Sequence, residues 1–159
     1  MSNRNIILRN VVKDDLPIFF EHQQNVEANY LAAFTSKDPS NWDSFIIHWN
    51  KILTNQDIIK RTIIVENEVV GHVLCFEQFG ETEVSYWIGN EYWGKGIATK
   101  ALQEFLKHVT IRPLYARAAK DNVGSLKVLK RCGFGITGED IGFSNARNKD
   151  VQEFILTLN

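Results

Sequence analysis

The amino-acid sequence predicts an α/β (α+β) protein built on one mixed, mostly antiparallel sheet of six to seven strands with about four helices on its faces. Two observations lead to this fold class. Between residues 61 and 88, three segments rich in Val, Ile and aromatic residues follow one another across short turns, which indicates consecutive antiparallel strands. After residue 96, helical and strand periods alternate, which indicates strand–helix–strand units. The strand that ends at Ile88 must therefore pair differently on its two sides.

The N-terminal third is expected to supply one strand and two helices. Ile6–Val12 reads as a strand, and Asp14-Asp15 offers an N-cap to a helix over about 15–24. Residues 30–37 have no clean period and are expected to form a loop or a short helix, whose partly exposed Tyr30 and Phe34 would shape a pocket. A second helix is expected to begin at Asp38-Pro39, and its apolar stripe is predicted to be core. That stripe consists of Trp42, Phe45, Ile46, Trp49, Ile52 and Leu53.

The later elements follow from the change of period. In chain order they are strands over 61–66, 69–78 and 83–88, a helix over 97–109, a strand over 114–120, a helix over 123–131, and strands near 134–137 and 152–158.

Composition limits the classes of function. The 159 residues, 44% of them apolar, are enough for one core, so one domain is expected over residues 1–159. Because 18 basic residues face 19 acidic ones, no positive field favours nucleic acid as a partner. No apolar run reaches the roughly 18 residues of a membrane helix, so no membrane association is expected. Cys75 and Cys132 lie in apolar runs and no signal-like segment opens the chain, which favours a reduced, cytoplasmic protein.

The turn from Trp93 to Thr99 is the most informative segment for function. Gly94 and Gly96 let a ligand approach the backbone, and the free amides at the following helix start favour an anion by about 0.3–2 kcal/mol. Lys95 adds positive charge. A plain connector between a strand and a helix would use the same glycines, so this turn alone is ambiguous.

Two other kinds of phosphate-binding loop are alternatives for this turn. The nucleotide-hydrolase loop needs Ser or Thr after Gly-Lys, and this chain has Gly96 there. A dinucleotide-binding domain would use Asp121 for the ribose, but its third glycine position is Thr99 and the chain beyond Asp121 is too short for a second nucleotide-binding half. It remains a remote alternative.

The turn resembles the coenzyme A pyrophosphate loop of the GNAT N-acetyltransferase superfamily, written Gln/Arg-x-x-Gly-x-Gly/Ala. Here it reads Trp93-Gly94-Lys95-Gly96-Ile97-Ala98. Trp93 departs from Gln or Arg and is similar to the branch that contains ribosomal-protein N-terminal (alanine) acetyltransferases. A second block, Asp121–Phe134, resembles that branch's Asn-x-x-Ser and a helix closing in Gly-Phe. With the opening strand and helix, the resemblance covers nearly the whole chain in the expected order.

The resemblance implies the GNAT fold and transfer of an acetyl group from acetyl-CoA to a primary amine, by direct attack in a ternary complex and without a metal. It implies that strand 84–89 splays from the next strand and holds pantetheine near Ile88. Asn122 would touch pantetheine or simply cap its helix, and Ser125 would protonate the leaving thiolate, because Leu129 stands where many relatives have Tyr. The remaining expected cofactor contacts are Trp93, Gly94, Lys95, Gly96, Ile97, Ala98 and Thr99.

The general base and the acceptor stay open. Glu83 and Tyr86 lie on opposite faces of one strand, so only one of them can face the acceptor; Glu83 ranks first, ahead of His72 and Glu77 on the preceding strand. Freeing a lysine-like amine at pH 7 costs roughly 4.6 kcal/mol against about 1 kcal/mol for an α-amine, which favours a protein N-terminus over a small-molecule amine. A non-catalytic CoA-binding module and a purely structural domain are the rival readings, and either a monomer or a homodimer fits.

Overall fold

The computed structural model describes residues 5–159, which form a seven-stranded sheet in the order β1-β2-β3-β4-β5-β7-β6. Each pair of neighbours is antiparallel except β4 and β5, which run parallel. The mixed, mostly antiparallel sheet and the two-sided pairing of the strand ending at Ile88 are therefore confirmed. The strands are β1 (Ile6–Asn10), β2 (Ile59–Val65), β3 (Glu68–Gln78), β4 (Glu81–Ile88), β5 (Leu114–Ala119), β6 (Gly135–Ser144) and β7 (Lys149–Leu158).

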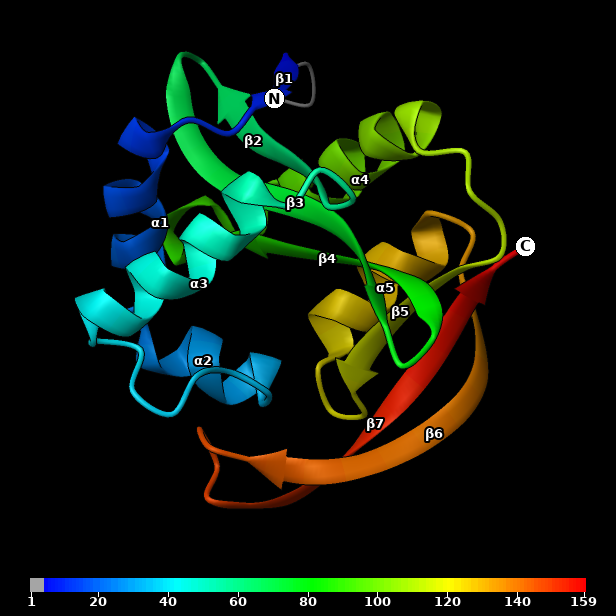
Figure 1. Cartoon of the computed structure of the whole chain (residues 1–159). Coiled ribbons are helices and arrows are strands. Elements are labelled where there is room, and N and C mark those ends of the chain that lie inside the picture. Colours follow the sequence, from blue (N-terminus) through cyan, green and yellow to red (C-terminus); the bar gives the residue numbers. More distant parts are fainter. Residues whose placement is uncertain (1–4) are drawn as a thin grey trace.

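Helices cover both faces of this sheet (Figure 1). On one face lie α1 (Leu16–His22), α2 (Val26–Ala32) and α3 (Trp42–Thr54), and on the other lie α4 (Ile97–His108) and α5 (Val123–Arg131). Two 3-10 turns, η1 (Lys13–Asp15) and η2 (Asn90–Tyr92), join strands to the following elements. The described residues thus contain five α-helices where about four were expected, because α2 forms where no helical period was clear, and its last residues, 30–32, lie in the segment without a clean period.

The two expected helix starts differ from the structure in their capping. The Asp15 carboxylate does not cap α1; it accepts hydrogen bonds from Arg9, from Val12 N–H and from Thr62. Helix α3 begins at Trp42 rather than at Asp38-Pro39, because Asn41 Oδ1 accepts from Ser44 N–H at 3.0 Å. Asp38, at the expected start of this helix, instead accepts hydrogen bonds from Ser40 within its own turn.

The last two strands are longer than the sequence predicted. β6 was expected only near 134–137 and continues to Ser144, and β7 begins at Lys149 rather than Gln152. β6 is an edge strand and most of its side chains are exposed, so it lacks the alternating apolar pattern of a half-buried strand. The prediction of a short strand was wrong for this physical reason.

Two apolar cores hold the helices on the sheet. The larger core lies between the sheet and helices α4 and α5, and Leu102, Phe105 and Leu129 are among its most buried side chains. The smaller core contains Phe45, Trp49 and Ile52 of the predicted α3 stripe, while Trp42 lies at its exposed edge. Burial at about 25 cal/mol per Å² of apolar surface is the main force that fixes both layers.

The middle of the sheet is open. Within residues 5–159, β4 and β5 share one register pair, Glu83 with Tyr115. Beyond that pair the two parallel strands diverge toward their C-terminal ends, as the resemblance implied for the strand that ends at Gly89. A V-shaped gap therefore separates Ile88 from Ala119, and the candidate site forms around it.

Candidate active site

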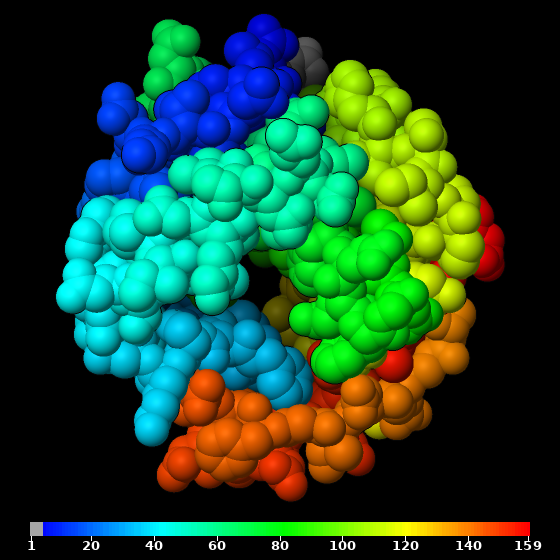
Figure 2. Space-filling model, viewed as in Figure 1, coloured from blue at the N-terminus to red at the C-terminus, as the bar shows by residue number. Residues whose placement is uncertain are grey.

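A cleft of about 2150 Å³ follows the V-shaped gap. β3, β4, β5, the Trp93–Thr99 turn and the first turn of α5 line one part, and α2, α3 and the loop after α2 line the other. Figure 2 shows its mouth as a deep hollow between α2 and α3, in blue and cyan, and the green β3–β4 hairpin. The cleft thus reaches both faces of the sheet through the gap between β4 and β5.

The backbone of β4 turns polar groups into this gap. Gly89 N–H donates to Val70 C=O at 2.9 Å, so Gly89 and Val70 form a hydrogen-bonded pair. This pair establishes which residues of β4 are hydrogen bonded to β3. Because bonded and non-bonded pairs alternate along an antiparallel ladder, the backbone groups of Tyr86 and Ile88 face the β5 side. The carbonyl of Ile88 accepts a hydrogen bond from Trp93 Nε1 at 2.9 Å. Trp93 therefore ties the glycine-bearing turn to the end of β4.

The turn itself has the backbone of an anion site. Gly94 and Gly96 have φ of +75° and +76°, a region that side chains rarely adopt. A Cβ built on either glycine meets no atom within 4 Å, so the space beside the turn is open. Gly96 precedes α4 without any side-chain cap, which leaves the first amides of the helix free for a ligand. The turn can therefore hold an anion with backbone amides.

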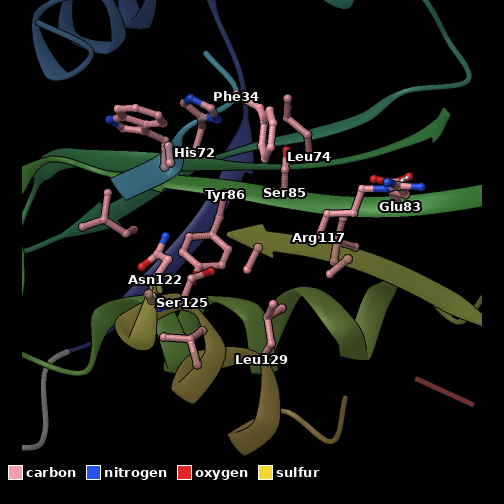
Figure 3. Close-up of a pocket in the computed structure, with 18 of the residues that line it drawn as sticks. Phe34, His72, Leu74, Glu83, Ser85, Tyr86, Arg117, Asn122, Ser125 and Leu129 are labelled. Carbon is pink, nitrogen blue, oxygen red and sulfur yellow. Dashed lines mark hydrogen bonds and ion pairs between the residues drawn. The ribbon is translucent and has the colours of Figure 1, made fainter. Parts of the chain in front are cut away.

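Two hydroxyl groups meet beside the gap. Tyr86 Oη from β4 lies 3.1 Å from Ser125 Oγ in the first turn of α5 (Figure 3). Asn122 Oδ1 accepts a hydrogen bond from Ser125 N–H at 3.3 Å and so caps α5. The expected capping role of Asn122 is therefore confirmed. Burial raises the pKa of Tyr86 to about 12, with the Ser125 hydrogen bond opposing it. At neutral pH the phenol is protonated and can donate a proton but cannot act as a base.

Glu83 lies on the opposite face of β4 from Tyr86, as its position in the strand predicted (Figure 3). Its carboxylate accepts from Arg117 Nε at 3.2 Å and from Gln78 Nε2 at 3.3 Å. Arg117 also binds Asp140 at 2.9 Å and Glu153 at 3.1 Å, so three carboxylates share one guanidinium. Burial raises the pKa of Glu83 and of Glu153, and Arg117 opposes the shift in both. Glu83 is therefore a buried carboxylate with an elevated proton affinity at the wall of the cleft.

Aromatic side chains line the cleft on this same face. The imidazole of His72 packs 4.7 Å from the Phe19 ring and 5.0 Å from the Trp49 ring. Burial, with smaller contributions from His22 and His48, lowers the pKa of His72 to about 3. Its Nδ1 and the Nε1 of Trp87 are buried without a hydrogen-bond partner. A group that holds a proton this weakly is a poorer base than Glu83.

Sequence reasoning missed two arginines near the cleft. Arg117 interrupts the apolar strand Leu114–Ala119, and a charge inside an apolar strand was a signal that it has a buried partner. Arg147 binds Asp121 through two hydrogen bonds of 2.7 and 2.8 Å from the turn between β6 and β7. Nothing in the local sequence marks Arg147, because its partners are far away in the chain.

Comparison with known proteins gives the family. Residues 5–135 match the family described as the Acetyltransferase (GNAT) domain. The chain belongs to the GNAT acetyltransferase family. The predicted GNAT fold is thereby confirmed, and so is the assignment of the chain as an acetyltransferase.

Relatives of this GNAT acetyltransferase cover nearly its whole length. An uncharacterized N-acetyltransferase p20 of Bacillus licheniformis is 22% identical over 96% of this chain and 92% of its own. Spermidine N-acetyltransferase from Vibrio cholerae, solved with CoA and spermine, is 20% identical over 96% and 95% of the two chains, with a TM-score of 0.78. RimL, a ribosomal L7/L12 α-N-protein acetyltransferase solved with CoA, is 18% identical over 99% and 97%, with a TM-score of 0.76. These structures show that the fold is shared.

Among residues 5–159, the helices are all too short or too polar to cross a membrane.

Proposed function

We propose that this GNAT acetyltransferase binds acetyl-CoA along the gap between β4 and β5 and transfers its acetyl group directly to a primary amine. The observation that carries the proposal is the order of groups along that gap. An open, uncapped anion turn lies at one end, backbone groups of β4 that face away from β3 follow, and a pair of hydroxyls lies at the first turn of α5. This order matches the pyrophosphate, the pantetheine and the thioester of one extended ligand. Neighbours of the same fold are complexes with CoA, which supports the choice.

The turn would hold the pyrophosphate with backbone amides. The residues assigned to the loop around the pyrophosphate are Trp93, Gly94, Lys95, Gly96, Ile97, Ala98 and Thr99, of which all but Trp93 would contact the phosphates. The N-terminus of α4 contributes its dipole and Lys95 contributes a positive charge. In this scheme the Trp93 side chain donates no hydrogen bond to the phosphates, because its indole N–H already donates to Ile88 C=O. Its part is to hold the turn at a fixed distance from β4.

The reaction needs an oxyanion donor and a proton for the leaving thiolate. Ile88 N–H faces the gap and would donate to the thioester oxygen as negative charge develops on it. The amine nitrogen forms a bond to the acetyl carbon while the carbon–sulfur bond breaks, and the thiolate takes a proton from Ser125. Tyr86 is hydrogen bonded to Ser125 and can resupply that proton. Asn122 keeps Ser125 in place through its backbone N–H and would also touch pantetheine.

Glu83 is the proposed acceptor of the amine proton. It lies three residues from Tyr86 along β4, roughly 10 Å away, so the proton must travel through water in the cleft. Its raised pKa brings the carboxylate closer to the working pH, which suits a general base. The three carboxylates around Arg117 exceed its single positive charge, so this wall also attracts the protonated amine before reaction.

The acceptor is proposed to be either a protein N-terminal α-amine or a small-molecule amine. An α-amine needs less help from a base than a lysine-like amine, which suits a base that acts at a distance. Neighbours of both kinds exist, one complexed with spermine and one named for a ribosomal protein. Two free cysteines, Cys75 and Cys132, fit the proposed cytoplasmic location.

Calorimetry with acetyl-CoA tests the proposal first. Gly96→Glu places a carboxylate in the open space beside the turn, and we expect it to abolish micromolar binding by the natural chain. Gly80→Glu is the matched control, because Gly80 also has positive φ (+78°) and open space but lies at the far end of β4. It carries the same backbone strain and should bind normally.

Acetyl-CoA binding and thiol release together distinguish an acetyltransferase from the two rival functions. Failure of the natural chain to bind acetyl-CoA would remove the proposal. Binding without release of free thiol in the presence of any primary amine would instead identify a CoA-binding module without turnover.

A further inference from the structure

The chain makes a strained turn directly after α2. Ala33 has φ +66° and ψ −53° and is fully buried, and Phe34 N–H donates to Ala32 C=O at 2.7 Å. This is a γ-turn of the rare, strained type, which an alanine adopts only when its surroundings enforce it. The strain has a local effect, because it reverses the chain and directs the next side chain, Phe34, toward the cleft.

The turn between β6 and β7 holds this strained segment. Ser144 Oγ donates to Ala33 C=O at 2.5 Å and is fully buried. Asn145 Nδ2 donates to Thr35 C=O at 3.1 Å, and Arg147 Nε donates to Tyr30 C=O at 2.8 Å. Three carbonyls from one short segment are thus bonded to a turn more than 100 residues away. In Figure 1 this turn, in orange, lies beside the loop after α2.

Phe34 lies over the acceptor side of the cleft. Phe34, His72, Leu74 and Ser85 all line the cleft, on the other side of β4 from Ser125 (Figure 3). The Phe34 side chain is 38% exposed, although it is a large apolar residue in a segment held by hydrogen bonds. The ring packs against Gly142 of β6: a Cβ added to Gly142 would lie 3.4 Å from Phe34 Cε1. The ring therefore has backbone behind it and open cleft in front of it.

We propose that Phe34 is a specificity-determining residue that limits the size of the amine acceptor. An amine that reaches the thioester from this face must place its substituent between the Phe34 ring and the β3–β4 surface formed by Leu74 and Ser85. A slim substituent passes, and one with a fused ring system is excluded. The strain at Ala33 and the bonds from the β6–β7 turn keep the ring at this position. The inference rests on the proposed function, since it takes this part of the cleft as the acceptor site.

The test compares a slim and a bulky amine by free-thiol release, using butylamine and 2-(1-naphthyl)ethylamine with acetyl-CoA. Phe34→Ala should raise the ratio of kcat/KM for the naphthyl amine to that for butylamine by about tenfold or more, the effect of opening a hydrophobic pocket. Phe143→Ala is the matched control, because Phe143 neighbours Gly142 on the same strand, is exposed and does not line the cleft. Its ratio should equal that of the natural chain.

Gly142→Val gives the opposite change. Its side chain pushes the Phe34 ring forward, so the ratio should fall below that of the natural chain. Thermal unfolding and acetyl-CoA calorimetry on each variant establish that it is folded and binds the co-substrate.

An unchanged ratio in both variants, with acetyl-CoA bound normally, would overturn the size limit. Absence of turnover with both amines in the natural chain and in Phe34→Ala would also overturn it. Failure of the natural chain to bind acetyl-CoA at all would instead reject the proposed function.

Discussion

At the scale of single residues, the proposed chemistry depends on two hydroxyls contributed by different elements. The resemblance implied a tyrosine at the position of Leu129, and here a tyrosine reaches Ser125 from β4 instead. Because the pKa of Tyr86 is raised to about 12, the pair is fully protonated across the neutral range. In the proposed mechanism, Ser125 therefore loses a proton to the thiolate and regains one from Tyr86.

Substitution of these hydroxyls should affect turnover more than binding. We expect Ser125→Ala to lower kcat about 100-fold, the lower end of general acid catalysis, and Tyr86→Phe to lower it about tenfold because Tyr86 acts through Ser125. Acetyl-CoA affinity should change little in either variant. Steady-state kinetics with butylamine and calorimetry measure the two quantities. Full kcat in Ser125→Ala would show that the thiolate is protonated by another group.

At the scale of elements, the buried carboxylate of Asp15 links η1 to the neighbouring strands β1 and β2. Asp15 accepts two hydrogen bonds of 2.8 Å from Arg9, one of 3.0 Å from Val12 N–H and one of 2.6 Å from Thr62 Oγ1. Burial alone would raise the pKa of Asp15, but these hydrogen bonds outweigh it and leave the pKa below its ordinary value. The Asp15 carboxylate therefore links η1 to β2. It does not form the helix cap that the sequence predicted.

Loss of this link should destabilise the protein in a pH-dependent way. Asp15→Ala should lower the free energy of unfolding by about 2–3 kcal/mol at pH 7, less than for a fully buried pair because Arg9 can return to water. A depressed carboxylate pKa contributes stability above the ordinary value of about 3.9 and loses it as pH falls through the folded-state value. Urea unfolding at pH 7, 5 and 3 should show the difference constant from 7 to 5 and smaller at 3. A difference that stays the same at pH 3 would contradict the role of the charge.

At the scale of the whole molecule, Arg147 joins three parts of the fold around the cleft. Its guanidinium binds Asp121 just before α5, stacks 4.3 Å from the Tyr30 ring and bonds to Tyr30 C=O in α2. The side chain is only 4% exposed, so these contacts are its main environment. The β6–β7 turn, α2 and the start of α5 are therefore held together by one residue.

Removal of Arg147 should loosen this corner without unfolding the sheet. Arg147→Ala should lower the free energy of unfolding by about 1–3 kcal/mol, since Asp121 is exposed and regains water. Arg147→Lys should not restore the loss, because an ammonium cannot replace the planar two-point contact. Hydrogen exchange should speed up in α2 and the β6–β7 turn and stay unchanged in β2 and β3. Uniform exchange across all strands would show that the residue acts on global stability alone.

Features of this protein that depend on neighbouring residues could be predicted from the amino-acid sequence. The order of strands and helices followed from apolar periods, and the turn from Trp93 to Thr99 followed from its glycines, because φ above zero and a free helix start are local properties. The opposite orientation of Glu83 and Tyr86 followed from strand alternation alone.

Contacts between distant side chains could be found only in the folded structure. Tyr86 and Ser125 are 39 positions apart, and Ser144 and Ala33 are 111 apart, so their contacts depend on sheet order and on the divergence of β4 from β5. The extent of β6 was hidden for a related reason, since an exposed edge strand is stabilised by pairing with β7 rather than by an apolar pattern of its own. Local sequence encodes backbone conformation, whereas the site depends on the packing of distant segments, and that packing exists only in the folded chain.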